Sequence, residues 1–457
     1  MASAFLRSKL IAVLIGPGGI GLMGVLGTFN AQIATIAGWG LGTTAVRTIA
    51  GATESERHLK VAAVRKFGRQ LASIGLVAVL LLVLPVSYLT FKSQEYAFEL
   101  FIAGLAVPCV IATAMWSALL QAGGHIGSMA RSQVKSSTLG MLAGLPFIYF
   151  WGTVGIAFSV FLAAATTAYV TWREATRLSP RSGSAPTCLD VRELVHLGAA
   201  LQFSAILSAL SSYVARVLIL RSHGDDLAAG LADAGYCQAA FAITGSLPGV
   251  IFSATNSDFF PRVAAAKDEQ EAQSITETQI KASLLLATPI LIGLLTMGQL
   301  AVRLLYAKGF EPAVPLLGWF VWAIFFFLMG WPLGFWLTAR GSKRTVAIFQ
   351  SLSSILMIIL GLMLIPFYGA KGVAAGYLGC GVIYCAVVMA FARRLSGRWP
   401  SRSTFIWFGV AAVMLALSSW AASVISGLYW GVIPTVISAG TCSIVYFRVV
   451  RTRPAGG

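Results

Sequence analysis

The sequence has few charged residues for its length. Lysine, arginine, aspartate and glutamate make up 11% of the 457 residues, whereas 57% are hydrophobic and the mean hydropathy is +0.81. Soluble globular domains carry about 25% charged residues, so this composition excludes an ordinary soluble fold. Because apolar runs of about 20 residues recur along the chain, we predict an all-α membrane protein with about 14 transmembrane helices.

Acidic residues, histidines and cysteines are also scarce, and they do not cluster. The 16 acidic residues fall in loops or at the ends of predicted spans, and the four histidines are scattered. The six cysteines include no C-x-x-C pair and no neighbouring histidine, so we expect neither a metal site nor a disulfide framework. We also expect no cofactor. The short loops that alternate with the basic ones disfavour an enzyme such as a membrane glycosyltransferase.

The basic residues indicate topology and not a nucleic-acid ligand. The formal net charge is +17, but most lysines and arginines fall in alternate gaps between the apolar runs. The opposite gaps hold only Lys92, Arg221, Lys308 and Lys371. Because basic loops stay on the cytoplasmic side of the membrane, we predict that both termini are cytoplasmic.

The predicted spans follow a short first helix. Segment 1–15 ends at the helix-breaking Gly16-Pro17 and is too short to cross a bilayer, so we expect either a natural start upstream of Met1 or a half-length first helix. The next span contains a glycine-rich segment, 38–42, which permits close packing or local unwinding. Segment 51–70 is charged and amphipathic, which is typical of an interfacial cytoplasmic helix. The spans are predicted at about 20–50, 71–91, 98–121, 136–150, 153–172, 197–220, 235–257, 282–304, 313–338, 345–367, 372–392, 404–426 and 429–447.

Glycine landmarks recur along the chain and divide it into two halves. Near-constant spacing between such landmarks favours two duplicated lobes in the same orientation, with a site between them. The corresponding pairs are Gly21 and Gly235, Gly124 and Gly341, and Gly155 and Gly372, at separations of 214, 217 and 217 residues. We therefore predict an N-terminal six-helix lobe (1–172), a cytoplasmic linker (173–195), a C-terminal six-helix lobe (196–393), and an extra transmembrane helix pair with a cytoplasmic tail (394–457).

One predicted span, 197–220, carries a single charged residue, Arg216. Ser204, Ser208, Ser212 and Arg216 recur every four residues, so a helix places them in one stripe. An arginine at the centre of a membrane helix costs about 2.5–3.5 kcal/mol. We therefore predict that Arg216 receives an anionic group. The alternative is that it snorkels to the nearby membrane interface.

Other polar residues in the predicted spans are weaker candidates for the same cavity. Arg47 would supply a second positive charge. The amide side chains of Asn30, Gln202 and Gln238 either line the cavity or form hydrogen bonds between helices.

Several short motifs, in order, resemble a known family. They are the Gly16–Gly21 turn, Gly40-Leu41-Gly42 before Arg47, Gly235–Ala240, Asp258–Arg262, Gln279 with Pro289, and Trp331–Gly334 followed by Ala339-Arg340-Gly341. The chain resembles the O-antigen and polysaccharide flippases of the multidrug, oligosaccharidyl-lipid and polysaccharide exporter superfamily.

This resemblance implies a function and a location. The expected activity is the transfer of an undecaprenyl-diphosphate-linked oligosaccharide across the bacterial inner membrane by alternating access, for O-antigen, lipopolysaccharide or another polysaccharide. The expected partners are this substrate, membrane lipids and the polysaccharide polymerase machinery, with no nucleic acid. Two alternatives within the superfamily stay open. A cation-coupled drug antiporter would need a membrane carboxylate, which the sequence does not show, and a lipid II flippase would fit the two additional C-terminal spans.

Overall fold

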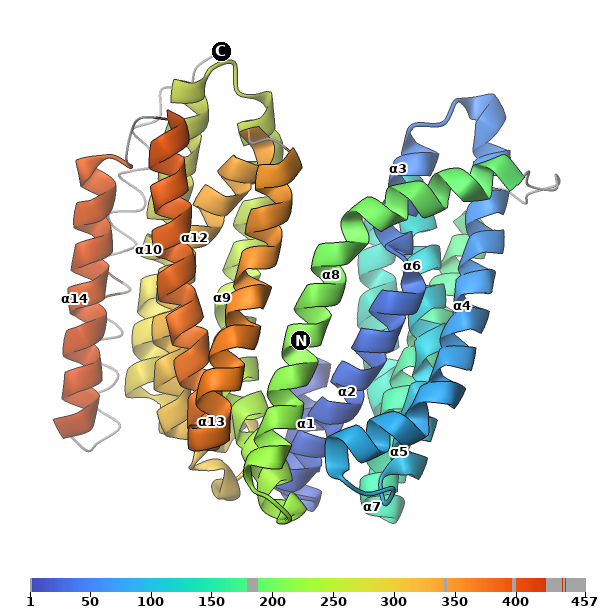
Figure 1. Ribbon diagram of the computed structural model, residues 1–457, viewed down its shortest axis with the longest axis horizontal. Helices are drawn as coiled ribbons and strands as arrows, with labels where there is room; N and C mark the ends of the chain where they lie inside the picture. The colour runs from blue at the N-terminus through green and yellow to red at the C-terminus, as the bar shows by residue number, and fades with distance from the viewer. Residues whose placement is uncertain are drawn as a thin grey trace. The chain divides into compact units, whose positions relative to one another are not determined.

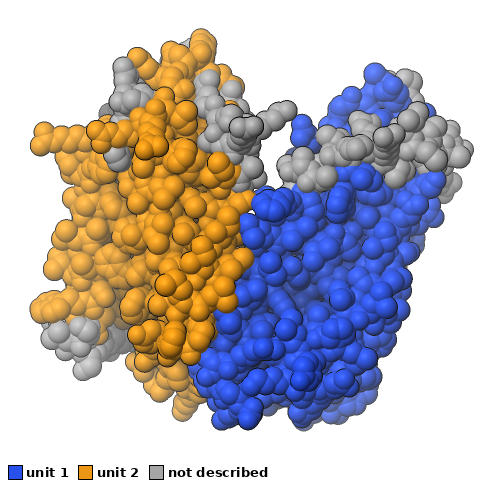
Figure 2. Space-filling view, viewed as in Figure 1, with its two compact units in different colours: residues 1–235 blue, residues 236–457 orange. Residues whose placement is uncertain are grey.

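The computed structural model describes residues 2–178, 188–340, 343–396 and 400–424, together with residues 438 and 440, and every regular element in these ranges is a helix (Figure 1). The chain divides into two compact units, residues 1–235 and 236–457 (Figure 2). Unit 1 contains α1 (Ala2–Leu14), α2 (Pro17–Gly38), α3 (Leu41–Ala50), α4 (Glu54–Phe91), α5 (Ala97–Gly104), α6 (Ala106–Ala122), α7 (Ile126–Leu178), α8 (Cys188–Ser222) and the start of α9 (Leu227–Ala265). Unit 2 contains the rest of α9, α10 (Glu269–Thr296), α11 (Gly298–Leu305), the short 3-10 helix η1 (Lys308–Phe310), α12 (Ala313–Arg340), α13 (Lys343–Ser396) and α14 (Arg402–Val424).

The helices confirm the predicted all-α membrane class. Within the described ranges, nine helical stretches are long and apolar enough to cross a bilayer. Two of these stretches, in α7 and α13, turn back at an internal glycine, so each supplies two of the predicted spans. The predicted last span, 429–447, lies outside the described residues.

The turns inside α7 and α13 have nearly the same backbone conformation. Gly152 has φ 52° and ψ −119°, and Gly369 has φ 52° and ψ −129°. Glycine occupies this left-handed region without the steric penalty of a side chain. Three residues later, a Cβ atom at Gly155 would overlap the carbonyl oxygen of Phe147, and one at Gly372 would lie 2.5 Å from that of Leu364. The shared G-x-x-G geometry supports the predicted internal repeat. Gly341, which belongs to another landmark pair, lies outside the described residues.

The helix unwinds within 38–42, which is one of the two structures that these glycines were expected to permit. Helix α2 ends at Gly38, and α3 begins at Leu41 after two left-handed residues, Trp39 with φ 46° and Gly40 with φ 64°. A left-handed tryptophan is unusual because its Cβ crowds the backbone. The Trp39 indole Nε1 donates a hydrogen bond of 2.9 Å to the Val195 carbonyl oxygen on α8, which fixes the side chain.

The segment 51–70, predicted as an interfacial helix, does not form a helix of its own. Helix α4 runs unbroken from Glu54 to Phe91, so the charged segment and the following span form one helix. Val61, Val64 and Phe67 on its apolar face are buried in the protein, and α4 packs against α6. The apolar face of this segment therefore packs against other helices of the protein.

Packing places α8 in unit 1. Helix α8 contacts α2, α3 and α4, and the Tyr213 hydroxyl lies 2.6 Å from that of Thr90 on α4. The side chain of Arg221 donates two hydrogen bonds to the Leu89 carbonyl oxygen, of 3.1 Å from Nε and 2.6 Å from Nη2. The lobes predicted from the sequence repeat have different limits from the compact units, because they assign α8 to the C-terminal lobe. These lobe limits stay a prediction.

Helices α2 and α9 cross within unit 1 at two glycines. A Cβ atom at Gly21 would overlap the Leu231 carbonyl oxygen and lie 3.1 Å from the Gly235 nitrogen. Conversely, a Cβ atom at Gly235 would overlap the Pro17 carbonyl oxygen and lie 3.1 Å from the Gly21 nitrogen. The two backbones therefore touch directly, and only glycine allows this approach.

Candidate functional site

Arg216 lies where the last turns of α8 meet α2. A methyl group added at Gly24 would lie 2.5 Å from Nη1 of Arg216 and 3.2 Å from Cζ. The guanidinium therefore rests against bare α2 backbone. Its side chain is partly buried, so it is neither sequestered in the core nor fully exposed. The sequence predicted the arginine as a binding residue, but not this contact.

The serines of the predicted stripe lie on the more open side of α8. Ser208 and Ser212 are exposed and Ser204 is partly buried. The Ser212 hydroxyl donates a hydrogen bond of 3.2 Å to the Ser208 carbonyl oxygen, which leaves its oxygen lone pairs available as acceptors. The stripe is thus a polar strip on α8 that leads to the Arg216 guanidinium.

Two of the predicted amides are buried in the helix packing of unit 1. The Gln202 side-chain nitrogen donates to the Thr35 carbonyl oxygen, which joins α8 to α2. Asn30 is 5% exposed, and neither of its amide atoms has a hydrogen-bond partner among the described residues. At 3.6 residues per turn, Asn30 lies about 120° around α2 from Gly24. The structure therefore places Asn30 on a different face from the one that contacts Arg216.

The two candidate arginines are far apart. Arg47 is exposed and belongs to α3, beyond the end of α2. Arg216 contacts α2 at Gly24, and the helix rises about 21 Å from there to its end at Gly38. The structure therefore does not bring Arg47 and Arg216 together at one site.

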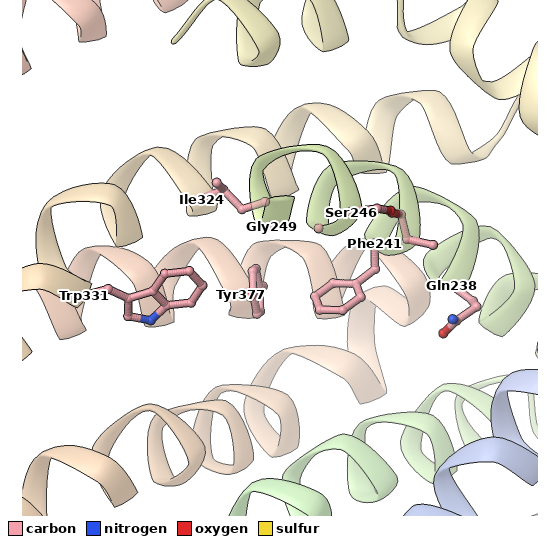
Figure 3. A pocket seen from close by; sticks show the side chains of 9 residues that line it. Gln238, Phe241, Ser246, Gly249, Ile324, Trp331 and Tyr377 are labelled. Carbon is pink, nitrogen blue, oxygen red and sulfur yellow. The ribbon is translucent and has the colours of Figure 1, made fainter. Parts of the chain in front are cut away.

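Unit 2 contains a pocket of about 520 Å³ between α9, α12 and α13, which we call the aromatic pocket (Figure 3). Small-molecule sites commonly have volumes of about 300–1,000 Å³. The described residues that line it are Gln238, Phe241, Ala242, Gly245, Ser246, Gly249, Ile324, Trp331 and Tyr377. None of these side chains is charged. The predicted residue Gln238 lies at one end of this pocket.

The sequence patterns do not predict the rings of the aromatic pocket. Trp331 belongs to one of the family motifs, whereas Phe241 and Tyr377 belong to none of them. A signal is present in the sequence, because Phe320, Phe327 and Trp331 lie at helical spacing along α12. Such a stripe does not by itself distinguish a pocket from a core.

Sequence reasoning also placed Glu99 among the acidic residues at span ends. The structure buries it, at 7% exposure, in the first turn of α5. Two other acidic residues form ion pairs near the turn from α8 to α9: Asp225 lies 3.6 Å from Lys92, and Asp233 lies 3.3 Å from His223. No group of three potential metal ligands occurs among the described residues.

These features define an all-α membrane protein with many spans, and its fold is similar to that of two kinds of solved transporter. The solved structure of lipid II flippase MurJ in an inward closed conformation matches with a TM-score of 0.72 and 13% identity, over 98% of this chain and 97% of that chain. The inward-facing conformation of a multidrug resistance MATE family transporter of the MOP superfamily matches with a TM-score of 0.65 and 17% identity, over 87% of this chain and 95% of that chain. At these identities the similarity shows the fold.

The chain belongs to the polysaccharide biosynthesis protein family, whose sequence profile matches residues 3–267. The profile of the lipid II flippase MurJ matches residues 232–450. The search of curated proteins found no significant match. The resemblance found in the sequence is therefore confirmed for the family and for the fold.

Proposed function

We propose that the protein is a flippase that moves an undecaprenyl-diphosphate-linked oligosaccharide across the bacterial inner membrane by alternating access. The substrate is the repeat unit of an O-antigen or another polysaccharide, which a polymerase then extends. The observation that carries this proposal is the position of Arg216, at the end of the polar strip of α8 and against bare α2 backbone, in a chain of the polysaccharide biosynthesis family.

The chemistry of arginine suits a diphosphate. The planar guanidinium offers several N–H donors in a fixed fork, which matches two phosphate oxygens at once. The exposed hydroxyls of Ser212 and Ser208 lie about one turn and two turns before Arg216 on the same helix. They supply additional hydrogen-bonding groups for the phosphates or for the first sugar.

The buried Glu99 favours a second candidate function, a cation-coupled antiporter. A carboxylate taken out of water is costly unless it binds a proton or another cation. Coupling of this kind is also compatible with a flippase, because a cation could drive the return step. The two functions therefore differ more clearly in the substrate, which is a lipid-linked oligosaccharide for the flippase and a drug for the antiporter, than in the coupling ion.

Substitution of Arg216 tests the proposal. Lysine keeps the charge but loses the planar fork, whereas glutamine keeps only hydrogen bonding. Arg216→Gln is expected to reduce surface-polysaccharide export by about tenfold or more, because hydrogen bonds to charged groups contribute about 1.5–3 kcal/mol. Arg216→Lys should retain much of the export, measured on extracted polysaccharide at equal protein abundance.

A matched arginine controls for loss of charge alone. Arg303 forms an exposed ion pair of 2.7 Å with Glu311, and such surface pairs contribute about 0–1 kcal/mol. Arg303→Gln should therefore leave export unchanged. Normal export by Arg216→Gln at normal abundance would remove Arg216 from the substrate site.

We also propose that both termini face the cytoplasm, because most basic residues fall in alternate loops. Single cysteines placed at positions 182 and 342, which lie outside the described residues, should react with a membrane-impermeant thiol reagent only after the cells are opened. Labelling of either position in intact spheroplasts would contradict this topology.

A further inference from the structure

We infer that the aromatic pocket of unit 2 binds an uncharged sugar ring of the lipid-linked oligosaccharide. This inference rests on the proposed function and names the part of the substrate that the pocket holds. It follows from three properties of the pocket: its open floor, its aromatic rings, and its lack of charge among the described lining residues.

The floor of the pocket is bare backbone of α9. Gln238, Phe241, Gly245 and Gly249 recur at helical spacing and line one side of the pocket. A Cβ atom built at Gly245 or Gly249 would meet no heavy atom of the described residues within 4 Å. These glycines therefore do not serve close helix packing, and open space lies where a larger side chain would be.

Three aromatic side chains, Phe241, Tyr377 and Trp331, follow one another along the pocket (Figure 3), and the buried ring of Phe327 behind them joins Tyr377 to Trp331. The ring of Phe241 lies 5.5 Å from that of Tyr377, and Phe327 lies 5.4 Å from Tyr377 and 5.3 Å from Trp331. Phe241 is 43% exposed although its neighbours pack around it. The C–H bonds of a sugar ring form apolar faces, and these faces pack well on the electron-rich faces of aromatic rings.

The polar groups of the pocket distinguish a sugar from the other parts of the substrate. A diphosphate would require a cation, and none of the described lining residues supplies one. A polyprenyl chain would need no polar groups, yet the pocket contains the Gln238 amide and the hydroxyls of Tyr377 and Ser246. The Ser246 hydroxyl donates to the Ala242 carbonyl oxygen, so its oxygen can still accept from a sugar hydroxyl.

Binding measurements with two lipids test the inference. The purified full-length protein, in a detergent without a sugar headgroup, is titrated with undecaprenyl diphosphate and with undecaprenyl diphosphate N-acetylglucosamine. The wild-type protein is expected to bind the glycosylated lipid about tenfold more tightly, which corresponds to about 1.4 kcal/mol. Gly245→Leu fills the pocket and should bring the ratio of the two dissociation constants close to one. It should leave the affinity for the bare lipid unchanged.

Two further variants complete the experiment. Gly409→Leu adds the same side chain at an exposed position of α14, where a Cβ atom meets no atom of the residues that the structure describes within 4 Å. This variant should keep the wild-type ratio. Phe241→Leu removes one ring without filling the pocket and should lower the ratio. If Gly245→Leu does not fold, the ratio measured for Phe241→Leu tests whether the pocket binds the sugar.

The possible outcomes separate this inference from the proposed function. A wild-type ratio in both pocket variants would overturn the sugar assignment. An equal loss of affinity for both lipids would also overturn it, because the pocket would then hold the polyprenyl chain that the two lipids share. Failure of the wild-type protein to bind either lipid would instead contradict the proposed function itself.

Discussion

Gly24→Ala is expected to lower polysaccharide export about tenfold while the protein accumulates in the membrane at its normal level. The added methyl group would lie 2.5 Å from Nη1 of Arg216, so the guanidinium must move. The displaced group is the end of a flexible side chain, and the fold therefore tolerates the change. The loss of one charge-assisted hydrogen bond to the substrate is worth about 1.5–3 kcal/mol, or tenfold and more in affinity.

The same helix provides the control for this variant. Gly27 is exposed, and a Cβ atom there would meet no atom of the described part of the chain within 4 Å, so Gly27→Ala should export normally. Both substitutions raise helix propensity by the same amount, about 1 kcal/mol. A difference in export between the two variants therefore cannot come from backbone entropy. Equal export by Gly24→Ala and Gly27→Ala would show that the position of the Arg216 guanidinium does not matter for transport.

Gly21→Ala and Gly235→Ala are each expected to destabilise the protein strongly and to abolish export. In both variants the new methyl group would overlap a backbone carbonyl oxygen of the facing helix. Backbone cannot move aside as a side chain can, so α2 and α9 must separate. Overpacking usually costs about 1–3 kcal/mol and sometimes more. The effect is measured as a lower unfolding temperature in detergent. The fraction of folded protein after heating is determined by size-exclusion chromatography.

Gly18 offers a matched comparison on the same helix. A Cβ atom at Gly18 would lie 3.9 Å from Cβ of Leu231, which is an ordinary contact with the same neighbouring residue. Gly18→Ala should therefore unfold close to the wild-type temperature. If Gly21→Ala unfolds there as well, the direct backbone contact between α2 and α9 does not exist in the folded protein.

Glycine-dependent turns could be predicted from the sequence because the residues themselves set the backbone. The breaks at Gly16-Pro17 and at 38–42 occur where they were predicted, and so does the turn at Gly152. These positions depend on local dihedral preference and not on distant partners. The all-α class followed from composition and run length for a similar reason, since a bilayer admits few backbone structures.

Features that depend on the neighbouring helix could not be predicted. The spacing of Leu59, Val64 and Phe67 on α4 predicts an apolar face, but it does not say whether lipid or protein covers that face. The four-residue spacing on α8 predicts a stripe that ends at Arg216, but it does not show that Gly24 lies opposite. The spacing of residues within one segment does not show which distant helix packs against it.

The division between the two compact units falls inside α9, which continues from Leu227 to Ala265 through Gly235. The units are therefore joined by hydrogen-bonded helix and not by a loop. Severing the chain at this point would leave four N–H groups and four C=O groups without their intrahelical partners. In hydrocarbon surroundings each such group costs several kcal/mol. A split version of this protein, expressed as two polypeptides, would have to be divided at an existing loop, and the half that receives all of α9 would carry part of the other unit with it.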